Sequence, residues 1–118
     1  NVQAREVDYI NAHATGTVQG DQEEALALRT IFGDGTPVSS LKGYLGHTLA
    51  ASGSLEIAAT LSMMSKEILY PTRNLKHVAE DCAGLRHVMR AEPARVDVVL
   101  KNSFGFGGVN CALVLARV

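Results

Sequence analysis

Three polar or glycine-rich segments of the sequence each lie at the end of an expected strand, which is where α/β folds place their sites. The first segment, Asn11–Thr17, holds His13. The second holds Lys42 and, five residues later, His47. The third is the glycine-rich run around Phe106. Histidine is the side chain most often used for general acid–base catalysis, so His13 and His47 are candidate catalytic residues.

Each of these residues also has a purely structural interpretation. A single histidine beside a turn more often makes a structural hydrogen bond than it catalyses a reaction. Glu24 fits a helix cap, and Lys42 fits a solvated loop lysine. Residues 105–108 fit a hairpin turn that requires positive φ, and exposure to solvent is expected for His77 and His87. The residues alone therefore indicate an α/β domain with two candidate catalytic histidines.

The spacing of the residues disfavours both a metal site and a dinucleotide site. The histidines form no H-x-x-x-H pair and no pairing with the cysteines. The glycine run lacks the G-x-G-x-x-G order, and a strand rather than a helix is expected after it. Cys82 and Cys111 lie far apart, which is typical of a reduced cytosolic protein rather than of a disulfide scaffold.

Two helices are expected to position the three segments. Asp21 is a good N-cap and Glu24 completes a capping-box pattern, so the first helix is expected to follow Asp21 and to end at Gly33–Gly35. The second helix is expected from Thr48 to about Lys66, and its side chains are small or apolar nearly all round. A helix without a polar face is expected to lie buried inside the protein.

The remaining elements are short strands separated by these helices. This order predicts an α/β fold with a mixed, five-stranded-type sheet and a buried central helix. Residues 74–95 are polar and irregular, and we expect a loop there with one turn of helix. A loop of residues 102–110 is expected to join the last two strands. The expected extended segments are Val7–Ala12, Pro37–Ser40, Ile68–Tyr70, Val96–Leu100 and Cys111–Leu115.

The chain has 118 residues, enough for one compact domain, which we take as residues 1–118. Its formal net charge of −1 gives no electrostatic footprint for nucleic acid or an anionic membrane. No apolar stretch is long enough to span a bilayer and no secretory leader is visible, so we expect a cytoplasmic location. Because the first residue is Asn1 rather than Met, we expect a piece of a longer polypeptide.

Taken together, the three segments resemble the C-terminal half of the elongating β-ketoacyl-ACP synthases, the condensing enzymes of fatty acid and polyketide synthesis. Asn11–Thr17 resembles the N-x-H-G-T-x-T string of that family. Lys42–His47 and Ala51–Gly53 resemble its K-x-x-x-G-H and A-x-G strings. Asn102–Gly108 matches its N-S-F-G-F-G-G string letter for letter. The resemblance covers essentially the whole chain and implies a thiolase-like fold.

The resemblance also implies a set of catalytic roles. His13 and His47 would donate N–H hydrogen bonds to the thioester oxygen of malonyl-ACP, on which decarboxylation builds negative charge. Lys42 would pair with Glu24 and orient the histidine segment. The backbone N–H of Phe106 would form part of an oxyanion hole, and the Phe106 side chain would gate the acyl pocket.

Five further residues are implied to bind the substrate. Thr15 and Thr17 would hydrogen-bond the phosphopantetheine arm, and Phe104 would line the pocket. Gly105 and Gly107 would permit the phenylalanine between them to swing. The arm is delivered by acyl carrier protein, so neither a metal nor a bound cofactor is implied.

The sequence departs from the family pattern at Ala14, Val18 and Val109, where glycine, proline and threonine are common. Two histidines resemble the elongating enzymes, since the initiating synthases use histidine and asparagine. The thiolases carry a C-terminal C-x-G-G string that is absent here. The family's nucleophilic cysteine lies in the N-terminal half, and neither Cys82 nor Cys111 has its setting.

We therefore expect a part of a homodimeric condensing enzyme whose partners are acyl carrier protein and the N-terminal half. On its own, the chain is expected to be inactive in condensation. The alternative is a non-catalytic partner subunit of the chain-length-factor type within a ketosynthase heterodimer. A third possibility is a module that binds carrier protein without catalysis.

Overall fold

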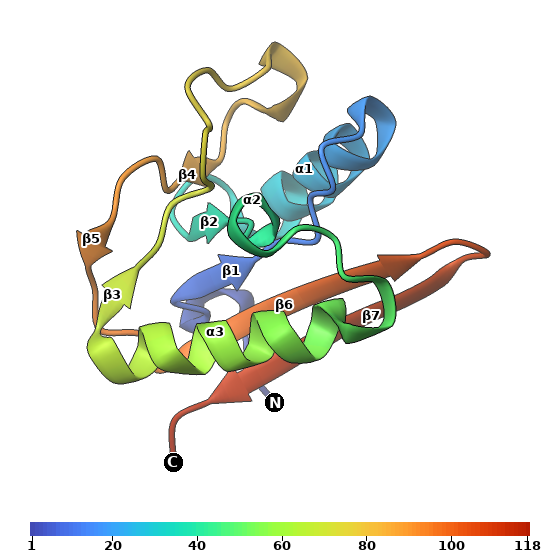
Figure 1. The fold of residues 1–118 in the computed structure, drawn as a ribbon. Helices are drawn as coiled ribbons and strands as arrows, with labels where there is room; N and C mark the ends of the chain where they lie inside the picture. The colour runs from blue at the N-terminus through green and yellow to red at the C-terminus, as the bar shows by residue number, and fades with distance from the viewer.

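The computed structural model describes all 118 residues and contains a five-stranded sheet flanked by helices (Figure 1). The strands lie in the order β4-β2-β1-β6-β7. The first four are parallel to one another, and β7 runs antiparallel to β6. The sheet is therefore mixed, as predicted. The bounds are β1 Tyr9–Asn11, β2 Pro37–Ser39, β4 Arg86–His87, β6 Val98–Gly105 and β7 Val109–Ala116.

Two long helices cover opposite faces of this sheet, α1 (Val18–Phe32) and α3 (Ser52–Lys66). Successive side chains of a strand point to opposite faces, and in β1 the neighbours Tyr9 and Ile10 enter different apolar clusters. Tyr9 packs in the cluster that contains Met63 of α3, whereas Ile10 packs in the cluster that contains Leu28 of α1. The core thus consists of two apolar layers with β1 between them.

The smaller elements connect these layers. Strands β3 (Ile68–Leu69) and β5 (Glu92–Pro93) form a separate antiparallel pair. None of the helices has the length and apolar character that crossing a membrane requires. The short helical segments are η1 Ala4–Glu6, α2 Lys42–Leu45, η2 Leu49–Ala51 and η3 Glu80–Cys82.

The predicted N-terminus of the first long helix was wrong. α1 begins at Val18 with Thr17 at the N-cap position, so Asp21 lies inside the first turn. Asp21 accepts a hydrogen bond from the backbone N–H of Gly16 at 3.1 Å instead of capping the helix. A carboxylate in the first turn is still favoured there, because it faces the positive end of the helix dipole. The predicted end is confirmed, since Gly33 is the C-cap residue with φ of 64°.

Helix α3 is buried on one side only. Ser52, Glu56 and Thr60, at intervals of one helical turn, face the sheet and are buried. On the outer side, Leu55 and Leu61 are 44% and 50% exposed. The central helix is thus present as predicted, but the described residues cover only its inner face.

The segment predicted as the last loop is mostly strand. β6 continues through Gly105 and β7 starts at Val109, so only Phe106, Gly107 and Gly108 form the turn. Both turn glycines have positive φ, 90° at Gly107 and 82° at Gly108, a region that side chains disfavour. This hairpin extends beyond the other elements (Figure 1).

Candidate active site

His13 and His47 lie face to edge, although they are 34 positions apart in the sequence. Their ring centroids are 5.4 Å apart and their planes are 88° to each other. His13 follows β1, and His47 follows the short helix α2 after β2. Because β1 and β2 are adjacent and parallel, the segments after both strands meet at one edge of the sheet. The structure therefore brings the two predicted histidines together.

A third ring joins them from the other neighbour of β1. Phe104 lies near the end of β6, which is parallel to β1. Its ring centroid is 5.6 Å from that of His13, with 71° between the planes. Phe104 thus lies within β6, His13 two residues beyond β1, and His47 in the loop that follows α2.

Glu24 of α1 fixes the backbone of the histidine segment. Its buried carboxylate accepts hydrogen bonds from the backbone N–H of His13 at 2.9 Å and of Ala14 at 2.7 Å. The side-chain amide of Asn102 in β6 donates to the same carboxylate at 3.1 Å. Ala14 has a positive φ of 25°, a strained value that these hydrogen bonds help to maintain. Glu24 therefore acts on His13 through the main chain.

The predicted pairing of Lys42 with Glu24 was wrong. Lys42 pairs with Glu56 of α3, with 2.6 Å between its Nζ and the carboxylate Oε1. The second oxygen, Oε2, lies 2.7 Å from Nζ of Lys101 in β6. Ser52 also donates a hydrogen bond to Oε1 at 3.1 Å. Glu24 is instead committed to backbone and amide N–H groups, so the two carboxylates have separate tasks.

We call Lys42, Glu56 and Lys101 the buried charge cluster. Their exposed fractions are 9%, 1% and 2%. Burial by itself would raise the pKa of Glu56, but the contacts with Lys101 and Lys42 outweigh it and lower that pKa. Burial lowers the pKa of Lys101, and the charge of Lys42 lowers it further, against the attraction of Glu56. The cluster is held together by charges that water does not screen.

Burial and the same charges keep His13 neutral. Its pKa falls from 6.5 to about 4, mainly by burial and then through the positive charges of Lys42 and Lys101 and the nearby His47. Glu56 opposes the shift but does not cancel it. At neutral pH His13 is therefore an uncharged imidazole, with one ring nitrogen that donates and one that accepts.

The tautomer of His47 is set by its own loop. The backbone N–H of Leu49 donates to Nδ1 of His47 at 3.3 Å. An imidazole nitrogen that accepts a hydrogen bond carries no proton, so the neutral ring has its proton on Nε2. His47 is exposed, which leaves this N–H group free to bind a ligand.

The family model for the beta-ketoacyl synthase, C-terminal domain, matches residues 1–76. That match covers more than half of the chain and includes both histidines and the buried charge cluster's Lys42 and Glu56.

The chain belongs to the β-ketoacyl synthase family.

A curated relative agrees with this family assignment. The 3-oxoacyl-[acyl-carrier-protein] synthase 1 of Escherichia coli is 38% identical over 113 residues, which are 95% of this chain. The chain spans only 28% of that relative's length.

Solved structures show that the fold is that of the ketosynthases. A β-ketoacyl synthase from Burkholderia phymatum has a TM-score of 0.93 and 41% identity, over 99% of this chain and 29% of its own. A type II polyketide ketosynthase in complex with its acyl-carrier protein has a TM-score of 0.92 and 31% identity, over 99% and 29%. A ketosynthase from Xenorhabdus doucetiae in complex with its chain length factor has a TM-score of 0.89 and 34% identity, over 100% and 30%. The predicted thiolase-like α/β fold is confirmed.

The remaining predicted residues of this β-ketoacyl synthase segment are exposed. Thr15 and Thr17 are exposed and share a hydrogen bond of 3.2 Å. Phe106 is fully exposed at the turn of the hairpin, between Gly105 and Gly107. Phe104, not Phe106, is the phenylalanine that touches His13.

Three residues of the β-ketoacyl synthase site were missed in the sequence: Glu56, Lys101 and Asn102. Glu56 is an acidic residue in an otherwise apolar part of α3, and Lys101 stands at the end of the apolar run Val98–Leu100. A charged side chain inside an apolar element can be buried only with a partner. The positions of Glu56 and Lys101 therefore indicated that each forms a buried ion pair. Which partner each would find depended on the packing of α3 against β6.

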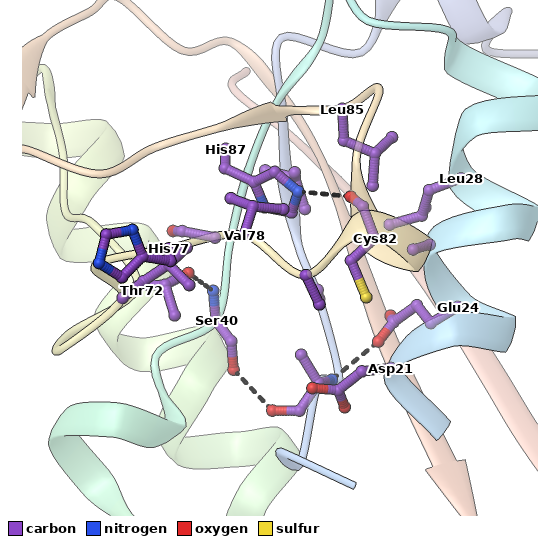
Figure 2. A pocket seen from close by; sticks show the side chains of 17 residues that line it. Asp21, Glu24, Leu28, Ser40, Thr72, His77, Val78, Cys82, Leu85 and His87 are labelled. Atoms are coloured by element: carbon purple, nitrogen blue, oxygen red, sulfur yellow. Dashed lines mark hydrogen bonds between the residues drawn. The ribbon is translucent and has the colours of Figure 1, made fainter. Parts of the chain in front are cut away.

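A cavity of about 230 Å³ lies behind the histidine segment, on the side of α1 (Figure 2). Its lining includes Glu24 and Cys82 but neither His13 nor His47. Burial raises the pKa of the Cys82 thiol, and the charges of Asp21 and Asp81 raise it further. Such a thiol stays protonated, which makes it a poor nucleophile.

Proposed function

We propose that this chain is the histidine-bearing part of an elongating β-ketoacyl-ACP synthase. The reaction is the decarboxylative condensation of an acyl thioester with malonyl-ACP, in fatty acid or polyketide synthesis. The observation that carries the proposal is the perpendicular pair of imidazoles, 5.4 Å apart and supported by separate strands. One ligand atom can accept hydrogen bonds from both rings.

The pair acts on the malonyl thioester. The bond between the methylene carbon and the carboxylate breaks and CO₂ leaves. The electron pair of the broken bond stays with the thioester and forms its enolate. The N–H groups of His13 and His47 stabilise the negative charge on the enolate oxygen. The enolate carbon then attacks the acyl thioester, and the thiolate to which the acyl group was bound leaves. Neutral imidazoles suit this task, because each must donate a proton to a hydrogen bond without losing it.

The other residues orient the pair and bind the substrate. Glu24 holds the His13 main chain through its hydrogen bonds, and Lys42 contributes positive charge through the buried cluster. Phe104 lines the acyl side of the site beside His13. Phe106 gates the pocket by moving with the hairpin, with Gly105 and Gly107 as its hinges.

The substrates arrive on a partner protein. Acyl carrier protein supplies the phosphopantetheine arm, which Thr15 and Thr17 bind, and no metal or other cofactor takes part. The acyl-carrier protein complex of a similar ketosynthase supports this partner. The proposal includes a cytoplasmic dimer whose N-terminal half contributes the nucleophilic cysteine.

A chain-length-factor-type subunit is the second candidate, because a similar ketosynthase forms a complex with a chain length factor. Such a subunit needs no catalytic residues, and this chain retains both histidines, Lys42 and Phe106. The residue at the nucleophile position of the full-length protein separates the two candidates. Cysteine there supports the synthase, and glutamine supports the partner subunit.

Decarboxylation of malonyl-ACP by the full-length protein tests the proposal. His13→Ala and His47→Ala should each lower kcat by about 10²- to 10³-fold, as expected for the loss of one oxyanion donor. His77→Ala, which removes an exposed histidine outside the site, is the matched control and should retain wild-type activity. Wild-type rates in both histidine variants would contradict the assigned roles.

A further inference from the structure

Lys101 is a buried lysine to which the proposed function assigns no task. It stands in β6, opposite Asn11 of β1, and its side chain reaches Glu56 on α3. Its Nζ also donates to Ser103 Oγ at 3.2 Å and to the carbonyl oxygen of Asn102. A lysine that is 2% exposed loses nearly all of its hydration, and these three acceptors compensate for that loss.

Glu56 does not need this second lysine as a counterion. Lys42 already lies 2.6 Å from Oε1 and Ser52 donates to the same oxygen. With Lys101 on Oε2, the cluster holds two ammonium groups and one carboxylate, which is a formal charge of +1. The structure thus places one more buried positive charge near His13 than Glu56 can balance.

The two carboxylates of α1 near His13 keep their own negative charges, but they accept hydrogen bonds from groups other than its imidazole ring. Glu24 accepts from the backbone N–H groups of His13 and Ala14 and from the side-chain amide of Asn102. Asp21, also on α1, accepts from the backbone of Gly16. His47 lies against the ring but adds no negative charge.

We propose that Lys101 is a positioning residue for the imidazole pair. By occupying one oxygen of Glu56, Lys101 keeps the net charge of the buried charge cluster beside His13 positive. A positive surrounding favours the uncharged, hydrogen-bonding form of His13 and attracts the anionic end of a malonyl-type substrate. Lys101 contributes to the low pKa of His13 after burial and Lys42, in agreement with this role. The inference rests on the proposed function for the identity of the substrate.

The test is a charge cycle in the full-length protein, with Lys101→Met, Glu56→Gln and the double variant. The cluster has a formal charge of +1 in the wild type, 0 in Lys101→Met, +2 in Glu56→Gln and +1 in the double variant. NMR titration measures the titration midpoint of His13 in each variant and does not require an active enzyme. Lys101→Met should raise the titration midpoint by on the order of one pH unit. Glu56→Gln should lower it, and the double variant should return it toward the wild-type value.

Kinetics provides the second measurement. Lys101→Met should raise KM for malonyl-ACP on the order of tenfold, and should move the acid limb of the decarboxylation pH profile to higher pH. Transfer of an uncharged acyl group to the cysteine should not change. Lys101→Arg should retain the charge and most of the wild-type profile. Lys66→Met, which removes an exposed lysine from the last turn of α3, is the matched control.

The outcomes separate this inference from the proposed function. If Lys101→Met leaves both the His13 midpoint and KM unchanged, or if Lys101→Met and Glu56→Gln shift the midpoint in the same direction, Lys101 is not a positioning residue. A wild-type protein without decarboxylase activity would refute the proposed function, while the NMR cycle would still decide the role of Lys101. If Glu56→Gln fails to fold, Lys101→Met and Lys101→Gln decide the question, since Glu56 keeps Lys42 in both.

Discussion

His13 couples the candidate site to the stability of the fold. Its pKa is lowered from 6.5 to about 4, first by burial and then by the lysines, so the folded protein binds this proton less readily than the unfolded chain does. Between pH 6.5 and pH 4 the unfolded state gains a proton that the folded state does not. The free energy of unfolding therefore falls as the pH falls through this window, and His13 has no such effect above it.

His13→Gln should remove this contribution. We predict that the variant loses less stability than the wild type between pH 6.5 and pH 4, measured as urea-induced unfolding of the full-length protein at several pH values. His77→Gln, at an exposed position, should retain the wild-type slope. Equal slopes in the wild type and His13→Gln would show that His13 is not held neutral by the fold.

Glu24→Gln should displace the histidine segment. Both carboxylate oxygens accept N–H hydrogen bonds, but an amide offers one oxygen and turns an N–H group toward a donor. We expect a loss of about 1–3 kcal/mol in the free energy of unfolding and a loss of kcat of at least about tenfold. Chemical denaturation and malonyl-ACP decarboxylation measure the two effects. Glu23→Gln, the exposed neighbour, should leave both unchanged.

The sequence identified residues of the site whose chemistry is visible locally. His13, Lys42 and His47 lie in polar segments after strands, and the structure brings them to one edge of the sheet as expected. The partner of Lys42 was misassigned, because Glu24 and Glu56 are both plausible carboxylates in a linear sequence. Only the packing of α3 on β6 decides between them, and that packing joins residues 45 positions apart, Glu56 and Lys101.

At the scale of elements, the sequence predicted the helices, which depend on local residues, better than the short strands, which depend on partners distant in the sequence. α3 was placed within a few residues, because its apolar run and its flanking residues are contiguous. β4 and β5 were missed within a segment taken as a loop. Each has only two residues and forms only by pairing with a strand distant in the sequence. In β5, for example, Glu92 pairs with Leu69 of β3. Strands this short carry no periodicity that a sequence pattern can reveal.

The β6–β7 hairpin depends on its turn glycines. Gly107 has φ of 90°, so an added Cβ is strained even though no atom lies within 4 Å of it. We predict that Gly107→Ala lowers the free energy of unfolding by about 1–2 kcal/mol. Gly35→Ala is the matched control, since Gly35 has equal space and no positive φ, and it should leave stability unchanged or slightly raised. Equal effects of the two substitutions in denaturant titrations would contradict this account of the turn.

Across the whole molecule, large apolar side chains remain uncovered on helix α3 and on strand β7. Leu55 and Leu61 lie on the outer side of α3, and Leu113 and Val114 lie on β7, 39% and 43% exposed. β7 is also the edge strand of the sheet, so one row of its backbone groups has no strand partner. Surfaces and edges of this kind promote association.

The isolated 118-residue chain should therefore self-associate and bind a hydrophobic dye. We expect sedimentation to show species larger than a monomer at micromolar concentration, and dye fluorescence to fall in a Leu55→Gln/Leu61→Gln double variant. Lys76→Gln, an exposed polar position on a loop, should not change the dye signal. A monomer that binds no dye would show that these side chains are covered in solution.

The contact between Phe104 and His13 has one further property, which comes from the strands beside it. Phe104 lies within β6 and His13 two residues beyond β1, and the hydrogen bonds between these two strands fix their spacing. Separating these two rings would require rupture of that ladder, which belongs to the cooperative core. On gradual heating, the contact should therefore persist until the sheet itself melts, whereas His47, in the loop after α2, has no such support.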